Sequence, residues 1–243
     1  MEALMTSNPA TAAPTSQTRT VLDCEQLSTR EVNGALRELP AGSRVTIVNP
    51  SGRHNLAVGL FQDLDILIDG HAGYFTGGLG AGPDITVNGF VGWSVGENLM
   101  SGSIRVRGGA SECAGASSHG GTVMIHGSAS SRAGISLKGG TVVVGGDVGH
   151  MSGFMAQAGT MLIGGDAGHA LGDSLYEAVI YVAGSIASLG SDARLEDLTQ
   201  SDVDTVRGLV DLTGFDHISP QDVKRVASAK QLYNFDALKG QEY

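Results

Sequence analysis

The stretch VVVGGDVGHMSGFMAQAGTMLIGGDAGHALGD, residues 142–173, contains the phrase GGDVGH and then, nineteen residues later, GGDAGH. The same spacing continues in both directions along the chain. Strand-like triplets begin at Ile47, Ile66, Ile85, Ile104, Val123, Val142, Met161 and Ile180. The first and third residues of each triplet are apolar, except for Asn49 in the first copy. A fixed period of this length indicates a solenoid with one coil per repeat.

Glycines recur in register with these triplets. Four residues after each start, from the second copy onward, the sequence places Gly70, Gly89, Gly108, Gly127, Gly146, Gly165 and Gly184. We interpret these as structural glycines at corners, where glycine permits a positive φ or a close approach of two backbones. Two further glycine columns follow, one eleven residues after each start and one just before the next strand.

Alternation within the triplets indicates which side chains face inward. The middle residues include Thr86, Arg105 and Tyr181, so each strand is expected to bury one face and leave the other largely exposed. A second inward column is expected to contain Phe61, Leu99, Leu137 and Leu175. Equivalent strands of neighbouring coils should pair in parallel.

These patterns predict an all-β fold, a right-handed parallel β-helix (solenoid) of about eight 19-residue coils over residues 47–191. Left-handed β-helices usually follow a strict hexapeptide, so the longer coil favours the right-handed form. The first residues, 1–19, are small and polar without an apolar core segment, and they predict a disordered tail.

Solenoids need caps at both ends. Residues 20–46 predict an N-terminal cap, with a strand followed by a helix that begins at a Ser28–Glu31 capping box and ends at Leu39. Residues 192–243 predict a helical C-terminal tail. Its helices are expected over 201–213, capped by Ser201 with Asp204, and from Ser219–Pro220 onward.

Composition excludes several classes of function. The net charge of −10 argues against nucleic acid, which needs clustered lysine and arginine. No stretch reaches the 18 or more apolar residues of a membrane span. Two cysteines, Cys24 and Cys113, are too few for a four-thiolate metal site. We therefore expect a cytoplasmic protein with reduced thiols.

The repeated Asp and His residues raise the question of a metal site. Asp147 and Asp166 should be neighbours in adjacent coils, as should His150 and His169. Such a ladder could bind a divalent cation. The interpretation we favour is structural, with each Asp accepting hydrogen bonds from corner amides, and we expect no metal.

Tyr74 and Trp93 fall in the same column as His150 and His169, which gives a surface with an aromatic end and an imidazole end. This column is either a partner-binding stripe or corner packing. The candidate interface consists of Tyr74, Trp93, His150, His169 and the aromatic segment with Leu232, Tyr233 and Phe235. Arg105 and Arg107 are expected to be surface charges. No Ser-His-Asp order and no nucleophile elbow occurs, so no catalytic residue and no cofactor-binding residue is predicted.

Several phrases carry a family resemblance. The glycine columns resemble the GXGXG β-helix found at the C-terminus of the glutamate synthase large subunit. Finer phrases, among them GENLMSGSIRVRG (96–108), VGGDVGHMSGFMAQAG (144–159) and YNFD (233–236), resemble the small β-helix subunit of N-methylglutamate synthase, also called methylamine–glutamate N-methyltransferase. The resemblance covers about 20–239.

The resemblance implies a function for the complex rather than for this chain. Family members act with a glutamine amidotransferase-like subunit and an FMN-binding glutamate synthase-like subunit, which holds the FMN and can also hold an iron–sulfur cluster. The implied reaction converts L-glutamate and methylamine to N-methyl-L-glutamate and ammonia. The chain itself is implied to be a non-catalytic scaffold without a cofactor.

Two alternatives stay open. The chain could be the β-helix subunit of another assembly, such as a glutamate synthase-like enzyme, formylmethanofuran dehydrogenase or the related formyltransferase/hydrolase complex. It could also be a free-standing binding module whose ligand face is the aromatic stripe. The amine substrate, the stoichiometry and the assignment of faces to partners do not follow from the sequence.

Overall fold

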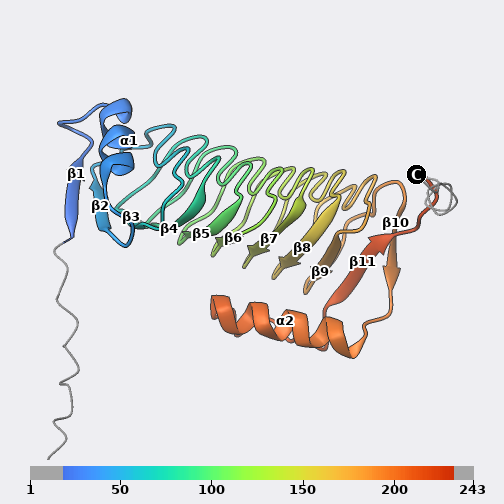
Figure 1. Ribbon diagram of the computed structural model, residues 1–243. Helices are drawn as coiled ribbons and strands as arrows, with labels where there is room; N and C mark the ends of the chain where they lie inside the picture. The colour runs from blue at the N-terminus through green and yellow to red at the C-terminus, as the bar shows by residue number, and fades with distance from the viewer. Residues whose placement is uncertain (1–18, 233–243) are drawn as a thin grey trace, which may run out of the picture.

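A computed structural model describes residues 19–232 and shows a parallel β-solenoid (Figure 1). Eight parallel strands follow one another along the rod: β2 (Arg44–Val48), β3 (Asp65–Ile68), β4 (Ala81–Val87), β5 (Ser101–Val106), β6 (Thr122–Ile125), β7 (Lys138–Val144), β8 (Ala158–Ile163) and β9 (Val179–Val182). Each strand pairs with the strand of the preceding and following coil. The predicted all-β parallel solenoid is confirmed, with about seven turns.

The 19-residue frame holds from the second coil to the last. Ile66 pairs with Ile85, and the register continues through the pairing of Met161 with Ile180. The first and third residues of these triplets are buried and stack on one another along the axis. A second row of parallel pairings consists of isolated single-residue bridges and begins with Ala72 and Val91. The core is therefore a continuous column of aliphatic side chains.

The first coil departs from the frame. Val45, not Ile47, pairs with Ile66, so this coil is two residues longer than predicted. The triplet is Val45–Ile47, which explains the polar Asn49 at the expected third position. A one-residue shift in the same coil corrects the second apolar column: Phe61 is 75% exposed, while Leu60 is fully buried.

The seven structural glycines are required by close stacking of coils rather than by φ. Among them only Gly70 has a positive φ. At Gly184 an added Cβ would lie 2.4 Å from the carbonyl oxygen of Gly165 in the preceding coil. At the corner eleven residues after each strand start, glycine is needed for its backbone conformation. Gly153, for example, has a φ of +70°. A side chain at either place would separate or strain the coils.

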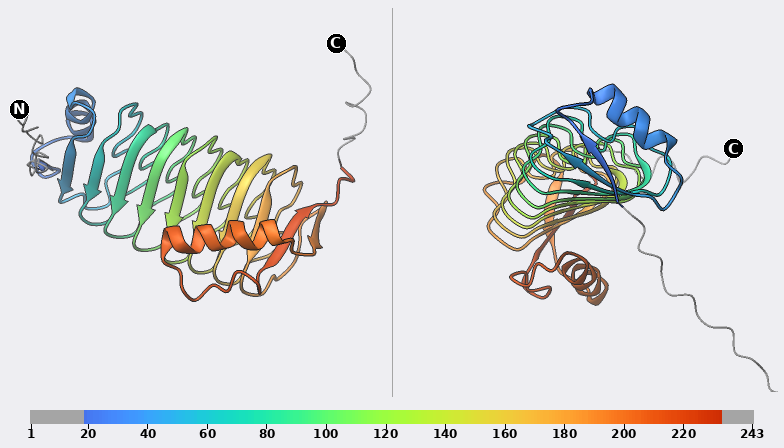
Figure 2. Two further views of the ribbon diagram at one scale, coloured as in Figure 1. Left: turned by 60° about the horizontal axis from the view of Figure 1, so that its bottom comes forward. Right: turned by 90° about the vertical axis from the view of Figure 1, so that its left-hand side faces the viewer.

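The N-terminal cap contains the expected strand and helix, although β2 already begins within the predicted range of 20–46. β1 (Thr20–Asp23) pairs in parallel with β2, and α1 (Thr29–Glu38) begins at the Ser28–Glu31 capping box. Figure 2 shows α1 at the N-terminal end of the rod. Its residues Val32 and Leu36 are fully buried and extend the core. Arg19, assigned to the disordered tail, instead donates to the Val45 carbonyl and to Asp65.

The C-terminal region differs from the predicted helical tail. After β10 (Ala193–Glu196) comes α2 (Gln200–Thr213), and the chain ends its described part with β11 (Lys224–Ser228). β11 pairs antiparallel with both β9 and β10, so the helix expected from Ser219–Pro220 is wrong. Residues 219–222 form a turn, and Val226 and Ser228 then alternate inward as in a strand.

The cap of α2 lies two residues before the predicted one. Thr199 and Asp202 form the capping box, not Ser201 and Asp204. Both pairs have the required spacing, but Asp202 also accepts hydrogen bonds from Tyr181 and Arg225 of the sheet. These tertiary contacts select the earlier start.

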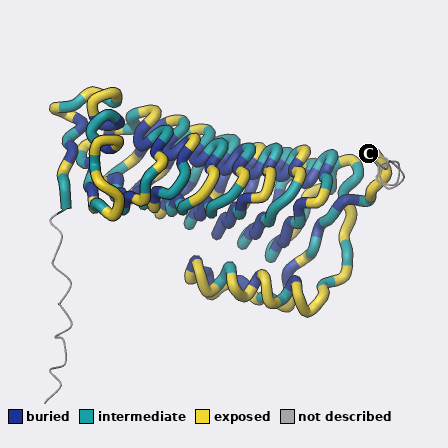
Figure 3. Tube along the Cα trace, viewed as in Figure 1, coloured by how far each residue is buried: buried dark blue, intermediate teal, exposed yellow. Residues whose placement is uncertain are grey.

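Helix α2 lies over the outer face of β6–β9, as both views in Figure 2 show. In Figure 3 these strands contain dark, buried segments. Their middle residues are buried beneath α2: Met124, Val143, Leu162 and Tyr181. Val206, Phe215, Ile218 and Val223 complete this second cluster. The prediction that the outer face is largely exposed is therefore wrong in this half of the rod. Neither helix of residues 19–232 is long and apolar enough to cross a bilayer.

Candidate functional site

The column that contains the predicted interface residues forms as expected. The amide of Phe75 donates to the carbonyl of Trp93, and that of Met151 donates to the carbonyl of His169, so these corners stack coil on coil. Tyr74, Trp93, His150 and His169 occupy equivalent positions and are all exposed. Leu232 is 54% exposed; Tyr233 and Phe235 lie outside the described residues.

The aromatic end of the column is a stack of three rings. The His54 and Tyr74 rings lie 3.7 Å apart between centroids at 15°, and those of Tyr74 and Trp93 lie 5.7 Å apart at 22°. Tyr74 is 50% and Trp93 54% exposed. His54 was not predicted, because the longer first coil places it 20 residues before Tyr74 rather than 19.

A second aromatic pair belongs to a parallel column three positions earlier in each coil. His71 and Phe90 are 5.6 Å apart between centroids, and Phe90 is 61% exposed. Both histidines are fixed by the backbone, since Nδ1 of His54 accepts from the Tyr74 amide and Nδ1 of His71 from the Phe90 amide. Sequence reasoning missed His71 and Phe90, although the repeat already aligned them.

The imidazole end is built differently from the aromatic end. Glu112 and Ser131 occupy the two coils between Trp93 and His150, so the column is interrupted. His169 Nδ1 lies 3.4 Å from Ser188 Oγ, its neighbour in the next coil. The aromatic and imidazole ends are therefore separate surfaces of the rod.

The Asp ladder forms hydrogen bonds of the favoured structural kind. Asp147 Oδ1 accepts from the Asp166 amide at 2.7 Å, and Asp166 Oδ1 accepts from the Ser185 amide at 2.6 Å. The bonds from Ser185, led by its backbone amide, lower the pKa of Asp166. In residues 19–232 no group of three or more His, Cys, Asp or Glu side chains is arranged to hold a metal ion. Metal content of the protein stays a prediction.

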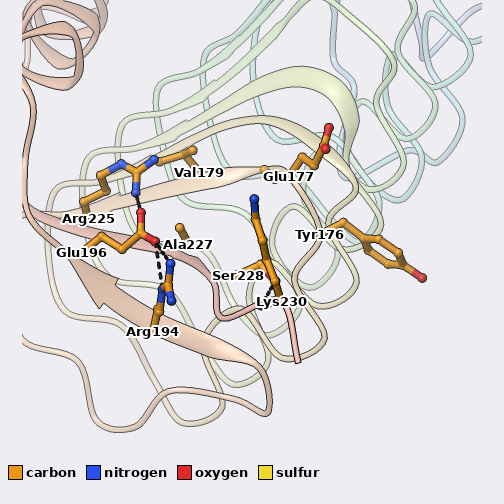
Figure 4. A pocket seen from close by; sticks show the side chains of 10 residues that line it. Tyr176, Glu177, Val179, Arg194, Glu196, Arg225, Ala227, Ser228 and Lys230 are labelled. Carbon is orange, nitrogen blue, oxygen red and sulfur yellow. Dashed lines mark hydrogen bonds and ion pairs between the residues drawn. The ribbon is translucent and has the colours of Figure 1, made fainter. Parts of the chain in front are cut away.

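An open cavity of about 310 Å³ lies at the C-terminal end of the rod (Figure 4). Its walls include Arg194, Glu196, Arg225 and Lys230. Arg194 and Arg225 both form ion pairs with Glu196, which lies between them. Arg225 also forms an ion pair with Asp202, so two carboxylates face the two arginine charges.

The same ion pairs continue into a polar network under α2. Arg225 Nε donates to Asp202 Oδ1 at 3.1 Å, and Tyr181 Oη donates to the same oxygen at 2.5 Å. Burial raises the pKa of Asp202, but hydrogen bonds from Thr199, Tyr181 and Arg225 outweigh it and lower the pKa to about 2. Burial, followed by the bond to Asp202, raises the pKa of Tyr181. This network joins α2 to β9 and β11 and fits a structural role.

Arg105 is not simply the surface charge that the sequence predicted. Its guanidinium lies 3.3 Å from the Leu212 carbonyl at the end of α2 and 3.3 Å from His126 Nε2. A cation there complements the negative end of the helix dipole. Burial, followed by the charges of Arg105 and Arg107, lowers the pKa of His126. Arg107 is exposed, as predicted.

Neither cysteine has the environment of an activated nucleophile. Cys24 is fully buried and Cys113 partly so. Burial raises the pKa of both thiols, which keeps them protonated near neutral pH.

Comparison with known proteins gives one partial similarity and no family assignment. No protein-family model matches the chain. The chain is 39% identical over 64 residues to Protein GlxC of Rhizobium meliloti (strain 1021). That match covers 26% of this chain and 28% of the length of the relative. It therefore indicates a related segment, and it assigns neither an activity nor a partner.

Proposed function

We propose that this chain is the non-catalytic β-helix subunit of a three-subunit enzyme that makes N-methyl-L-glutamate from L-glutamate and methylamine with release of ammonia. The observation that carries the proposal is the 19-residue glycine-framed solenoid together with the phrases that resemble the N-methylglutamate synthase β-helix subunit. The partial similarity to Protein GlxC supports a relationship over the 64 matched residues.

The chemistry of the chain agrees with a supporting role. The thiols are held protonated by burial, and the carboxylates of the Asp ladder are used as acceptors of backbone amides. In this proposal FMN, and any iron–sulfur cluster, belongs to the glutamate synthase-like partner.

A stiff rod suits an enzyme whose chemistry is divided between two sites. An amidotransferase-like subunit and a flavin subunit would handle reactive nitrogen at separate places, and fixing both sites in space limits loss of intermediates to solvent. The parallel coils supply straight columns of surface residues for docking both partners. We place the complex in the cytoplasm.

Native purification through a tag on this chain tests the proposal. Both partner subunits should co-purify, with flavin bound to the complex, while the isolated chain should be colourless and inactive. A variant that ends at Leu232 tests the predicted contribution of Tyr233 and Phe235. This variant should retain the fold, because the core of the described residues ends before Leu232. It should co-purify with smaller amounts of the two partner subunits. A chain that purifies alone from its native source would contradict the proposal.

A further inference from the structure

Exposed apolar side chains are concentrated on the first coils of the rod. Between residues 60 and 100 six large hydrophobic side chains are exposed: Phe61, Tyr74, Leu79, Phe90, Trp93 and Met100. Between residues 101 and 190 the corresponding set contains Met155 alone, and that residue is 36% exposed. Such clustering is typical of a binding surface, and Trp and Tyr are the residues most often at the centre of one.

The rings of this surface are held in place before any partner binds. His54, Tyr74 and Trp93 stack along one column, and His71 with Phe90 along the next. The Phe90 ring lies over Gly109, where an added Cβ would be 3.2 Å from the ring. Pre-ordered rings lose little conformational entropy on binding. We call the five residues His54, His71, Tyr74, Phe90 and Trp93 the aromatic face.

The charge around the aromatic face is mainly negative. From His54 to Ile104 the sequence contains no lysine or arginine, but it has five carboxylates: Asp63, Asp65, Asp69, Asp84 and Glu97. Asp65 is paired with Arg19 and Arg44. One coil beyond Trp93, at the equivalent position, the column continues with Glu112, whose carbonyl accepts from the Ser94 amide. From His54 to Glu112 the sequence thus carries six carboxylates against two arginines, Arg105 and Arg107, so these coils are mainly acidic.

We propose that the aromatic face binds an arginine-containing segment of a partner polypeptide. A guanidinium can stack on the Tyr74 and Trp93 rings while Glu97 and Glu112 accept its N–H groups, which is the pairing that arginine favours over lysine. This proposal deepens the proposed function, since it states the chemistry of one docking contact.

Other occupants fit the charge less well. Residues 1–18 contain no lysine or arginine, and residues 233–243 contain one lysine with two carboxylates. A second copy would bring a chain of net charge −10 against an acidic surface. The complementary occupant is a basic segment of a different chain.

Trp93 is the sole tryptophan of the sequence, so it can report on the face directly. The full chain labelled with 5-fluorotryptophan gives one ¹⁹F resonance that unlabelled probes cannot obscure. The probe is an acetylated, amidated decapeptide in which arginine alternates with leucine, and matched peptides carry lysine or glutamate at the arginine positions. The arginine peptide should shift the resonance saturably, the lysine peptide more weakly, and the glutamate peptide not at all.

Variants separate the aromatic face from the rest of the surface. Tyr74→Ala with Phe90→Ala should weaken binding at least tenfold, and Glu97→Gln with Glu112→Gln severalfold with a reduced dependence on salt. Met155→Ala, an exposed apolar residue on the other half of the rod, should leave the affinity unchanged. Circular dichroism confirms that each variant is folded.

Three results would overturn the proposal: no shift at millimolar arginine peptide, an equal shift with the glutamate peptide, or a shift that depends on protein concentration alone, which would identify a second copy as the occupant. Failure here is distinguishable from failure of the proposed function. Assembly of the three-subunit complex with an unchanged Trp93 resonance would refute the docking surface alone. Saturable arginine-peptide binding with no co-purifying subunits would refute the proposed function alone.

Discussion

From β3 onward the early and late coils of the rod share one backbone frame but present different outer faces. In β3 and β4 the middle residues, Leu67 and Thr86, are partly exposed and no helix covers them. In β8 the equivalent residue, Leu162, is fully buried beneath α2. The frame is set by the residues that repeat, whereas the surfaces are set by the residues that change from coil to coil.

The largest expected effect comes from glycine substitutions that disturb the close stacking of coils, which both halves of the rod share. Gly102 and Gly159 occupy equivalent positions with φ of +88° and +99°, and an added Cβ would lie 2.3 Å from a carbonyl oxygen of the preceding coil in both. Either substitution to alanine should lower the free energy of unfolding by about 3–4 kcal/mol. Gly127→Ala, with its nearest contact at 3.1 Å, should cost about 1 kcal/mol. Chemical denaturation measures all three, and equal costs at all positions would contradict the close-stacking explanation.

The next prediction sharpens the difference between the halves. Leu162→Ala removes a fully buried side chain between β8 and α2 and should cost about 2–3 kcal/mol. Leu67→Ala changes the same position of an uncovered strand and should cost less than about 1 kcal/mol. Urea unfolding of both variants gives the comparison. Equal losses would show that α2 does not cover the sheet in solution.

The polar network under α2 adds a pH dependence to the stability of the later coils. The pKa of Asp202 is about 2 in the folded protein, below the value of about 3.9 for an unfolded chain. A depressed pKa means that the ionised carboxylate stabilises the fold above about pH 4, and that this stabilisation is lost as the pH falls from about 4 to 2.

We expect the contribution of Asp202 to be about 1–2 kcal/mol after allowance for coupling to Arg225. Asp202→Asn should be less stable at pH 7 and should lose less stability than the parent on acidification to pH 2.5. Parallel unfolding curves for the two proteins across this range would contradict the network as described.

The smallest effect is expected at the imidazole end of the column. His150→Ala with His169→Ala removes two exposed side chains and should change stability by less than about 0.5 kcal/mol. Elemental analysis should find zinc, iron and manganese below stoichiometric amounts in both the parent and the variant. A stoichiometric metal that disappears in the double variant would show that the Asp–His ladder is a metal site.

The sequence predicted the features that repeat and missed those that depend on long-range contacts. The 19-residue frame and the Asp ladder could be predicted from spacing, because each coil repeats the same local geometry. The α1 capping box could be predicted because it depends only on two residues of one helical turn. The first coil was misaligned because Ile47 is an inward residue of the true triplet and also fits the start of the predicted one, and the polar Asn49 was the signal against the predicted register.

The C-terminal errors have a tertiary cause. Two helix starts, at Thr199 and Ser201, are equally good locally, and contacts of Asp202 with Tyr181 and Arg225 decide between them. The strand β11 forms because the edge of β9 is available for pairing. One signal was nevertheless present in the sequence: the middle residues become apolar from Met124 onward, which marks the face that α2 covers.

The most direct test of the scaffold proposal is to omit this chain from the enzyme. The amidotransferase-like and flavin subunits are expressed with and without it, and formation of N-methyl-L-glutamate from L-glutamate and methylamine is measured. We predict that without the chain the two subunits do not assemble and the rate falls severely, and that adding the purified chain restores it. Assembly of the two subunits with the full rate in its absence would contradict the proposal.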